Sequence, residues 1–260
     1  MSLKNKRILI TAGPTWVPID TVRVISNIAT GQTGILLAEK LRSLGAKVTL
    51  LLGPVPNVVF LHSVSSGSRA EVSASRRDAS TSSFIRERET KAKTAFGIEA
   101  CYLNKKIKLI RFQSFGELKN LIIKELKYEQ YDIVIHSAAV SDYKPSKVYS
   151  GKIKSGIKNL RLSLAPTEKI IDLLKRIDNS ITLVGFKFEP QARKDILIKK
   201  TRELMRQANL DLAVANTIDK NKYRAYILDN YNCSYGPVFN KKDLVTKLAD
   251  LIPSAKIPGL

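Results

Sequence analysis

Apolar segments of two kinds alternate along the chain. Short runs rich in β-branched residues, such as 131–136, have the pattern of buried parallel strands. Longer segments, such as 32–44, repeat apolar residues every three or four positions and are typical of amphipathic helices. We expect strands at 6–12, 47–52, 107–112, 131–136, 160–164, 182–186 and 210–216, an exposed strand pair at 223–228, and helices at 32–44, 115–127, 167–176, 191–208 and 240–251. This alternation predicts an α/β fold, a doubly wound, Rossmann-like, mostly parallel sheet with helices on both faces.

Residues 63–99 interrupt this alternation. Serine and arginine are frequent in the segment, and neither the strand period nor the helix period is present. A segment of this kind buries too little apolar surface to offset the entropy that ordering costs. We therefore expect a single domain over residues 1–260, with a disordered insertion at 63–99 between the second and third strands.

Charge and cysteine content narrow the class of protein. The formal net charge is +21, from 44 basic and 23 acidic residues, which suits nucleic acid or anionic metabolites as partners. Basic residues are spread along the chain and aromatic residues do not alternate with them, so a basic nucleic-acid-binding protein is kept only as an alternative. Two cysteines make no disulfide framework and no apolar run could span a bilayer, so we expect a cytoplasmic protein without a membrane partner.

A segment of small and hydroxyl residues, 26–34, stands between the first strand and the first helix. It places backbone N–H groups at a helix N-terminus, which attracts anions, and phosphate is the expected guest. The alternative is that Thr30 is an N-cap and the glycines allow close packing. The spacing differs from a dinucleotide site, because Gly13 is the one glycine of the first turn and no acidic residue ends the second strand.

Two further constellations carry candidate chemistry. Residues 137–143 follow a central strand, at the edge where open α/β sheets bind ligands. There Asp142 could accept from a base or a ribose or hold Mg²⁺ through water, or it could form an Asx turn or a helix cap. A lysine-rich loop follows at 144–158, with no acidic residue. Such a loop can fold over a polyphosphate, or it can be a solvated surface.

A rival interpretation arises in the same region. Tyr143 and Lys147 have the spacing of the Tyr-x-x-x-Lys pair of short-chain dehydrogenases. That pair needs one helical turn between its members, and Pro145 disfavours a helix there. A short-chain-type NAD(P) oxidoreductase is therefore kept as an alternative. No cluster of His and Cys has the spacing of metal ligands, so no metal-ligating residue is assigned.

Taken in order, these motifs resemble those of phosphopantothenate–cysteine ligases. The resemblance covers residues 6–54 and 104–251, and the flavin-dependent decarboxylase domain often fused ahead of this domain is absent from the sequence, so we expect a stand-alone form. The matching segments are 13–15, 19–23, 25–31, 138–143, 152–154, 184–189 and 214–216.

The resemblance implies a ligase of coenzyme A biosynthesis that joins 4′-phosphopantothenate to cysteine through an acyl-nucleotide. It implies a nucleoside triphosphate co-substrate, Mg²⁺ and a homodimer, and we expect CTP rather than ATP. Catalytic roles fall to Asn27 and Lys152. Nucleotide binding falls to Ala138, Asp142, Phe186, Lys187 and Arg206, and phosphate or substrate binding to Gly13, Gly31, Gln32, Gly34 and Lys154.

The chain also departs from the family pattern. Two lysines that many bacterial members carry on the helix before Asp211 correspond to Leu204 and Ala208 here, which leaves the triphosphate contacts open. A lysine directly after Phe186, here Lys187, resembles the pattern of the shorter and eukaryotic-type members, and the eukaryotic ones mostly use ATP.

Overall fold

A computed structural model describes residues 3–55, 58–60, 101–103 and 106–255. The chain divides into two compact units, Met1–Val55 with Lys106–Leu260, and Pro56–Lys105. In the second unit β5 (Val58–Phe60) pairs in parallel with β6 (Cys101–Leu103). The insertion predicted at 63–99 lies outside the described residues.

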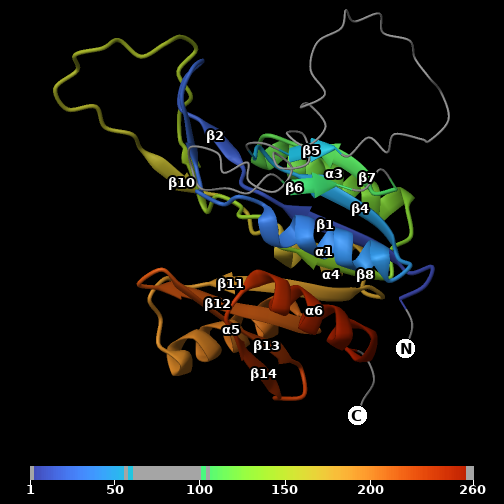
Figure 1. The fold of residues 1–260 in the computed structure, drawn as a ribbon. Coiled ribbons are helices and arrows are strands. Elements are labelled where there is room, and N and C mark those ends of the chain that lie inside the picture. Colours follow the sequence, from blue (N-terminus) through green and yellow to red (C-terminus); the bar gives the residue numbers. More distant parts are fainter. Residues whose placement is uncertain (1–2, 56–57, 61–100, 104–105, 256–260) are drawn as a thin grey trace, which may run out of the picture. The chain divides into compact units, whose positions relative to one another are not determined.

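The first unit is built on an eight-stranded sheet with the order β14-β13-β12-β11-β8-β1-β4-β7 (Figure 1). Its strands are β1 (Arg7–Ala12), β4 (Lys47–Leu52), β7 (Lys108–Arg111), β8 (Ile133–His136), β11 (Thr182–Phe188), β12 (Leu212–Asp219), β13 (Lys222–Asp229) and β14 (Ser234–Val238). The six adjacent strands from β12 to β7 in this order pair in parallel. Strand β13 runs antiparallel to both of its neighbours. The predicted doubly wound, mostly parallel sheet is confirmed.

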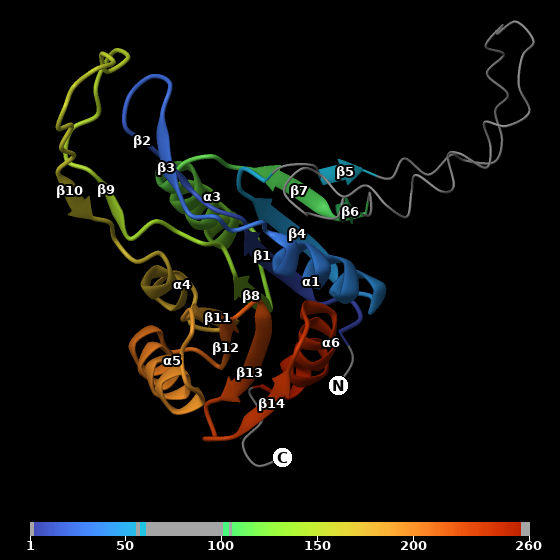
Figure 2. The same ribbon diagram turned by 60° about the vertical axis from the view of Figure 1, so that its left-hand side comes forward.

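Helices cover both faces of this sheet (Figure 2). On one face α1 (Gln32–Ser43) packs beside α6 (Lys241–Leu251), which a short 3₁₀ helix, Ile252–Ser254, follows. On the other lie α3 (Phe115–Tyr128), α4 (Ile171–Ile177) and α5 (Lys194–Ala208). Because side chains alternate along a strand, each central strand contributes buried residues to both layers.

Two strand predictions were wrong. The strand expected at 160–164 is instead β10 (Leu164–Pro166), which pairs antiparallel with β9 (Tyr143–Pro145) away from the main sheet, and the helix expected at 167–176 is α4, which begins at Ile171. The apolar alternation of 160–164 belongs to a segment that is largely exposed in the chain. The pair expected at 223–228 is the single strand β13, whose residues 225–229 are buried because β14 and α6 follow it.

A short hairpin, β2 (Trp16–Pro18) with β3 (Val24–Ser26), was not predicted, because strands of three residues leave too little periodicity to detect. It lies beside the ribbon of β9 and β10 (Figures 1 and 2). We call residues 16–26 and 143–166 together the arm.

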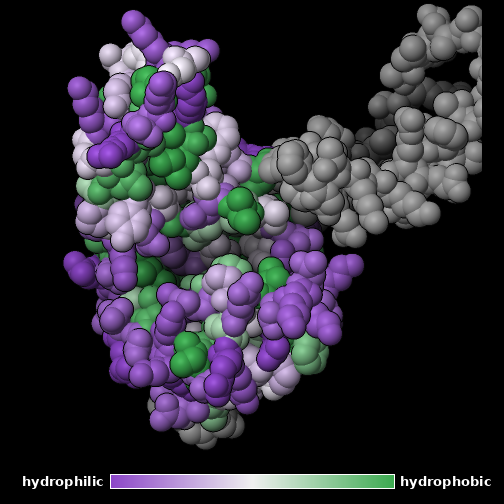
Figure 3. Space-filling model, turned by 90° about the vertical axis from the view of Figure 1, so that its left-hand side faces the viewer, coloured by the Kyte–Doolittle hydropathy of each residue, from purple (hydrophilic) through white to green (hydrophobic). Residues whose placement is uncertain are grey.

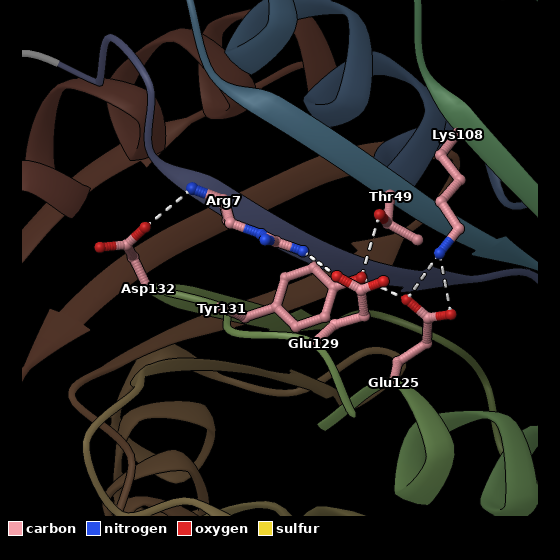
Figure 4. A network of polar contacts seen from close by, with 7 residues as sticks. All are labelled: Arg7, Thr49, Lys108, Glu125, Glu129, Tyr131 and Asp132. Atoms are coloured by element: carbon pink, nitrogen blue, oxygen red, sulfur yellow. Dashed lines mark hydrogen bonds and ion pairs between the residues drawn. The ribbon is translucent and has the colours of Figure 1, made fainter. Parts of the chain in front are cut away.

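A polar network lies at the end of the sheet where the parallel strands begin, opposite to the end that their carboxyl termini form (Figure 4). Buried Glu125 of α3 accepts from Lys108 Nζ at 3.1 Å on both oxygens and hydrogen-bonds the Tyr131 hydroxyl, which lies 3.0 Å from Thr49 Oγ1. The network ties α3 to β4 and β7. The rest of it comprises Arg7, Glu129 and Asp132.

Candidate functional site

The carboxyl ends of β1 and β8 meet where the chain order in the sheet reverses, which is where open α/β sheets bind ligands. The loops after the two strands are joined by backbone hydrogen bonds. Ala139 N donates to Gly13 O at 2.9 Å, and Thr15 N donates to Ala139 O at 3.3 Å. The fully buried Thr15 accepts from Ser141 N at 3.0 Å. These bonds make a fixed floor of residues 13–15 and 138–142.

Asn27 lies on this floor. Its Nδ2 donates to Ala139 O at 3.0 Å and to Val140 O at 3.3 Å. The structure thus brings a predicted catalytic residue to the loop that contains Ala138 and Asp142. Two carbonyl groups of the floor thus orient the Asn27 side-chain amide.

The N-terminus of α1 points to the same edge. Its N-cap is Gly31, in the left-handed conformation with φ 70, and no side chain caps the helix. The alternative that Thr30 is the N-cap is therefore wrong. The close-packing interpretation does hold for Gly34, since a Cβ placed there would lie 2.3 Å from Ala12 Cβ and 2.9 Å from Ser137 Oγ. The first turn of α1 thus rests directly on the end of β1. Gln32 N donates to Thr30 Oγ1 at 3.4 Å, which leaves the N–H groups of Thr33 and Gly34 for an anion.

Gln32, the first residue of α1, contacts the other helix on its face. Its Oε1 accepts from Lys241 Nζ at 2.8 Å, and Lys241 is the first residue of α6. The start of α6, which Asn240 caps, therefore lies beside the N-terminus of α1 at the carboxyl edge, and the N-terminus of α1 and Lys241 favour negative charge there.

His136 supports the floor from below, and sequence reasoning assigned it no role. Its Nδ1 lies 2.9 Å from Thr11 Oγ1, which accepts from Ala138 N at 3.3 Å. Burial lowers the pKa of His136 to about 4, so the ring is neutral at pH 7. The one available signal was a histidine at the end of an apolar strand.

Phe186 and Lys187 belong to β11, which pairs with β8, and their side chains lie on opposite faces of the sheet because strand residues alternate. Lys187 Nζ lies 3.0 Å from Glu189, which also pairs with Lys200 of α5 at 2.7 Å. The hydrogen bond from Lys200 and then that from Lys187 lower the pKa of Glu189. The structure therefore brings Phe186 to the face of α1 and α6, and Lys187 to the face of α5.

Asn216 of β12 lies opposite Phe188 in the register. Ala213 and Ala215 belong to the core on the α5 side, so alternation places Asn216 on the face of α1. Its Oδ1 is buried and has no hydrogen-bond partner within the described residues. An unpaired buried acceptor is costly unless a ligand or water satisfies it, so this atom suits a donor on a bound molecule.

Asp142 is exposed at the end of the floor, and its backbone oxygen accepts from Thr167 N at 2.9 Å. Among the described residues no backbone N–H donates to its carboxylate, which disfavours the Asx-turn and cap alternatives. The dehydrogenase alternative fails here as well, because Tyr143–Pro145 is a strand and the Tyr-Lys pair shares no helix.

Three predicted residues lie away from the floor. Lys152 and Lys154 are exposed on the arm. Arg206 belongs to the last turn of α5, beside the segment whose Asp211 N donates to Leu183 O at the start of β11. Arg206 is therefore at the opposite edge of the sheet. The two positions without the family lysines are structural, since Ala208 is buried and Leu204 packs against the core.

Within the described ranges, no group of three or more His, Cys, Asp or Glu residues could hold a metal ion. None of the helices in those ranges is long and apolar enough to cross a membrane.

Comparison with known families decides the affiliation. The family model described as DNA/pantothenate metabolism flavoprotein C-terminal domain matches residues 3–85 and 84–253. The chain belongs to this family. Among curated relatives, the coenzyme A biosynthesis bifunctional protein CoaBC of Thermococcus kodakarensis is 33% identical over 217 residues, which are 84% of this chain and 42% of that protein. The chain spans about half the length of the curated relatives it matches.

Solved structures agree on the fold. The DNA/pantothenate metabolism flavoprotein from Streptococcus pneumoniae superposes with a TM-score of 0.71 at 24% identity, over 96% of this chain and 99% of that one. A Cab2 mutant in complex with phosphopantothenate-cysteine superposes with a TM-score of 0.65 at 20% identity, over 96% of this chain and 88% of that one.

Proposed function

We propose that this chain is a phosphopantothenate–cysteine ligase of coenzyme A biosynthesis. The observation that carries the proposal is the floor at the carboxyl edge, where Asn27 is bound to the 139–140 peptides beside the uncapped N-terminus of α1. The family assignment and the relatives that act in coenzyme A biosynthesis support it. A related fold has been solved with phosphopantothenate-cysteine bound.

The reaction has two steps. The carboxylate of 4′-phosphopantothenate attacks the α-phosphate of a nucleoside triphosphate, the bond to the β-phosphate breaks, and pyrophosphate leaves. The amine of cysteine then attacks the acyl carbon, the nucleoside monophosphate leaves, and the amine loses a proton. The first step brings a carboxylate against a polyphosphate, so it needs positive charge and fixed geometry.

The chain's residues suit these demands. The N–H groups at the start of α1, near Gly13, Gly31 and Gly34, suit the phosphates, and Gln32 and Lys241 border them. Lys152 and Lys154 reach the polyphosphate from the arm. Asn27 holds the acyl carbonyl for the second step.

Mg²⁺ fits as an ion carried by the nucleotide. Mg²⁺ commonly uses one or two carboxylates together with substrate phosphates, and Asp142 offers one exposed carboxylate at the floor. The ion would neutralise phosphate charge there.

The base is assigned to the face of β11 and β12 that Phe186 and Asn216 share. The unpartnered Asn216 Oδ1 suits a base with an exocyclic amino group, which cytosine and adenine have and uracil lacks. We assign CTP as the preferred nucleotide. Backbone groups of the rigid Ala138–Asp142 floor would reject a mismatched base by roughly ten- to a hundredfold.

We assign a homodimer formed through the arm. Large apolar side chains are exposed there, and Figure 3, which faces the arm, shows them gathered on its upper part. An exposed apolar surface of this kind is typical of an interaction site. In a dimer with twofold symmetry the same patch of each copy forms the interface, so a second copy can cover it. The exposed residues are Trp16, Val22, Val24, Tyr143, Val148, Tyr149, Ile157, Leu160 and Leu164.

Pyrophosphate release tests the function. The protein is mixed with phosphopantothenate, cysteine and Mg²⁺, with CTP or ATP in turn. We expect release that needs phosphopantothenate and is faster with CTP. Lys152→Ala should lower turnover by about a hundredfold or more, whereas Lys124→Ala, an exposed lysine on α3, should leave it unchanged. The proposal fails if neither nucleotide gives release, and the loop assignment fails if both variants are fully active.

A further inference from the structure

Asp20 has a buried carboxylate in the turn between β2 and β3. Its side chain is fully shielded from solvent, yet it accepts several hydrogen bonds. Two are local, from Val22 N and Arg23 N at 2.8 Å each, and Arg23 Nη1 adds an ion pair. A further bond comes from Ile153 N at 3.0 Å, from a residue that lies 133 positions later in the chain.

Two hydrogen bonds hold the backbone of Ile153, one at its N–H and one at its carbonyl oxygen. Its N–H donates to Asp20, and its carbonyl oxygen accepts from Arg23 Nη1 at 3.3 Å. The Ile153 side chain is 7% exposed, whereas Lys152 and Lys154 on either side of it are exposed. A single buried residue is thus held between two solvated lysines.

The rest of the loop is held loosely. Within the described residues, the two hydrogen bonds at Ile153 are the only ones that tie residues 150–158 to other segments, and the nearest other contact is Tyr149 N with Ile19 O at 3.0 Å. A Cβ built on Gly151 or Gly156 meets nothing within 4 Å, so neither glycine packs against another segment.

We propose that Asp20 is the positioning residue of the lysine loop: by clamping Ile153 it fixes where Lys152 and Lys154 stand. This inference rests on the proposed function in taking Lys152 as a group that reaches the substrate. Without these bonds the two lysines would sample all the backbone conformations that the nine-residue loop 150–158 can adopt. With them, the backbone between the two lysines is held at Ile153, and their freedom is limited to the adjoining backbone torsions and their own side-chain rotations.

The charge of Asp20 is suited to this role. Burial by itself raises its pKa, but the hydrogen bonds from Val22 N, Ile153 N and Arg23 lower the pKa to about 2. The carboxylate therefore stays ionised at every pH at which the enzyme would work. An asparagine would keep one acceptor oxygen and turn an amide group toward these N–H donors, which opens the clamp.

Limited trypsin digestion of the protein alone tests the clamp directly. Cleavage after Lys154 is followed in the wild type, in Asp20→Asn and in Ile153→Pro, which removes the clamped N–H and leaves the hairpin untouched. We expect both variants to be cut after Lys154 about tenfold faster or more, because a charge-assisted hydrogen bond is lost. Asp132→Asn is the matched control, since Asp132 also accepts from a backbone N–H, that of Arg7, but at the opposite edge.

Kinetics tests positioning apart from folding. Asp20→Asn should lower kcat about tenfold with little change in the KM of the nucleotide. Added to a variant that carries both Lys152→Ala and Lys154→Ala, it should slow turnover no further. Unchanged cleavage after Lys154 in both clamp variants would overturn the proposal, as would faster cleavage with an unaltered kcat. A wild type with a clamped loop and no ligation would instead refute the proposed function and leave the clamp standing.

Discussion

Gly34 offers a sharp test of how the floor is built. It is the third residue of α1, and a Cβ added there would lie 2.3 Å from Ala12 Cβ. That is about 1 Å short of an ordinary carbon–carbon contact of roughly 3.5 Å. Ser137 Oγ, at 2.9 Å, can rotate away, but the methyl of Ala12 is fixed to β1 and has no rotamer to change. Gly34→Ala therefore forces α1 to shift on the sheet.

The cost can be worked from this overlap. Overpacking of a tight contact costs about 1–3 kcal/mol, and replacing glycine in a helix returns about 0.5–1 kcal/mol. We expect a net loss of about 1–2 kcal/mol in the free energy of unfolding. For a domain of this size that lowers Tm by roughly 2–8 °C. Because the shift displaces the helix N-terminus from the phosphates, the KM of the nucleotide should rise as well.

Gly116→Ala is the matched control. Gly116 is the second residue of α3, and a Cβ there meets nothing within 4 Å. That variant should gain about 0.4–1 kcal/mol and keep the wild-type KM. Urea unfolding and calorimetry of both variants, with nucleotide titrations, decide the matter. If Gly34→Ala is as stable as Gly116→Ala, the contact of α1 with β1 is not as tight as described.

Four further variants test other parts of the structure. Tyr131→Phe should cost about 1–3 kcal/mol in urea unfolding, because buried Glu125 loses a hydrogen-bond partner, while turnover stays unchanged since the network lies at the far edge. In the wild type the pKa of His136 is about 4 when folded and about 6.5 when unfolded, so the unfolded chain binds the proton first as the pH is lowered. The free energy of unfolding therefore decreases by up to about 1.4 kcal/mol for each pH unit below about 6.5, down to about pH 4. His136→Gln should remove this part of the pH dependence. Urea midpoints at pH 7, 6 and 5 for both proteins measure this, and equal slopes would contradict it. Arg206→Ala should leave the KM of the nucleotide unaltered, because Arg206 lies at the far edge of the sheet in its own chain. Phe186→Ala should raise the KM, because Phe186 lies on the face assigned to the base.

The elements that the sequence predicted well are those whose burial is set by neighbours on both faces. The run 131–136 and the helix at 32–44 have strong periods, and the structure has β8 and α1 there. The arm was misread, because its strands have three residues each and its apolar side chains face outward. Hydrophobic patterning reports burial inside one chain, so an apolar surface exposed in that chain is assigned to the core by mistake.

Site residues divide in a similar way. Motif order located Asn27, Ala138 and Asp142, since each follows a recognisable strand or loop, and the structure brings them together. Spacing alone could not tell that Lys187 faces α5, or that Arg206 lies at the other edge. His136 and Asp20 act through contacts with segments more than a hundred positions away, which no local pattern reports.

Rigid and loosely held parts of the site match the two demands of the proposed reaction. The floor is joined by backbone hydrogen bonds between the ends of β1 and β8, so it can hold an acyl-nucleotide in one geometry through both steps. The lysines are needed only while a polyphosphate is present, and they stand on a segment tied at a single residue, Ile153. A loop fixed as firmly as the floor would hinder release of pyrophosphate, and an unanchored one would lose the geometry of the first step. One buried carboxylate, Asp20, sets the balance between these two extremes.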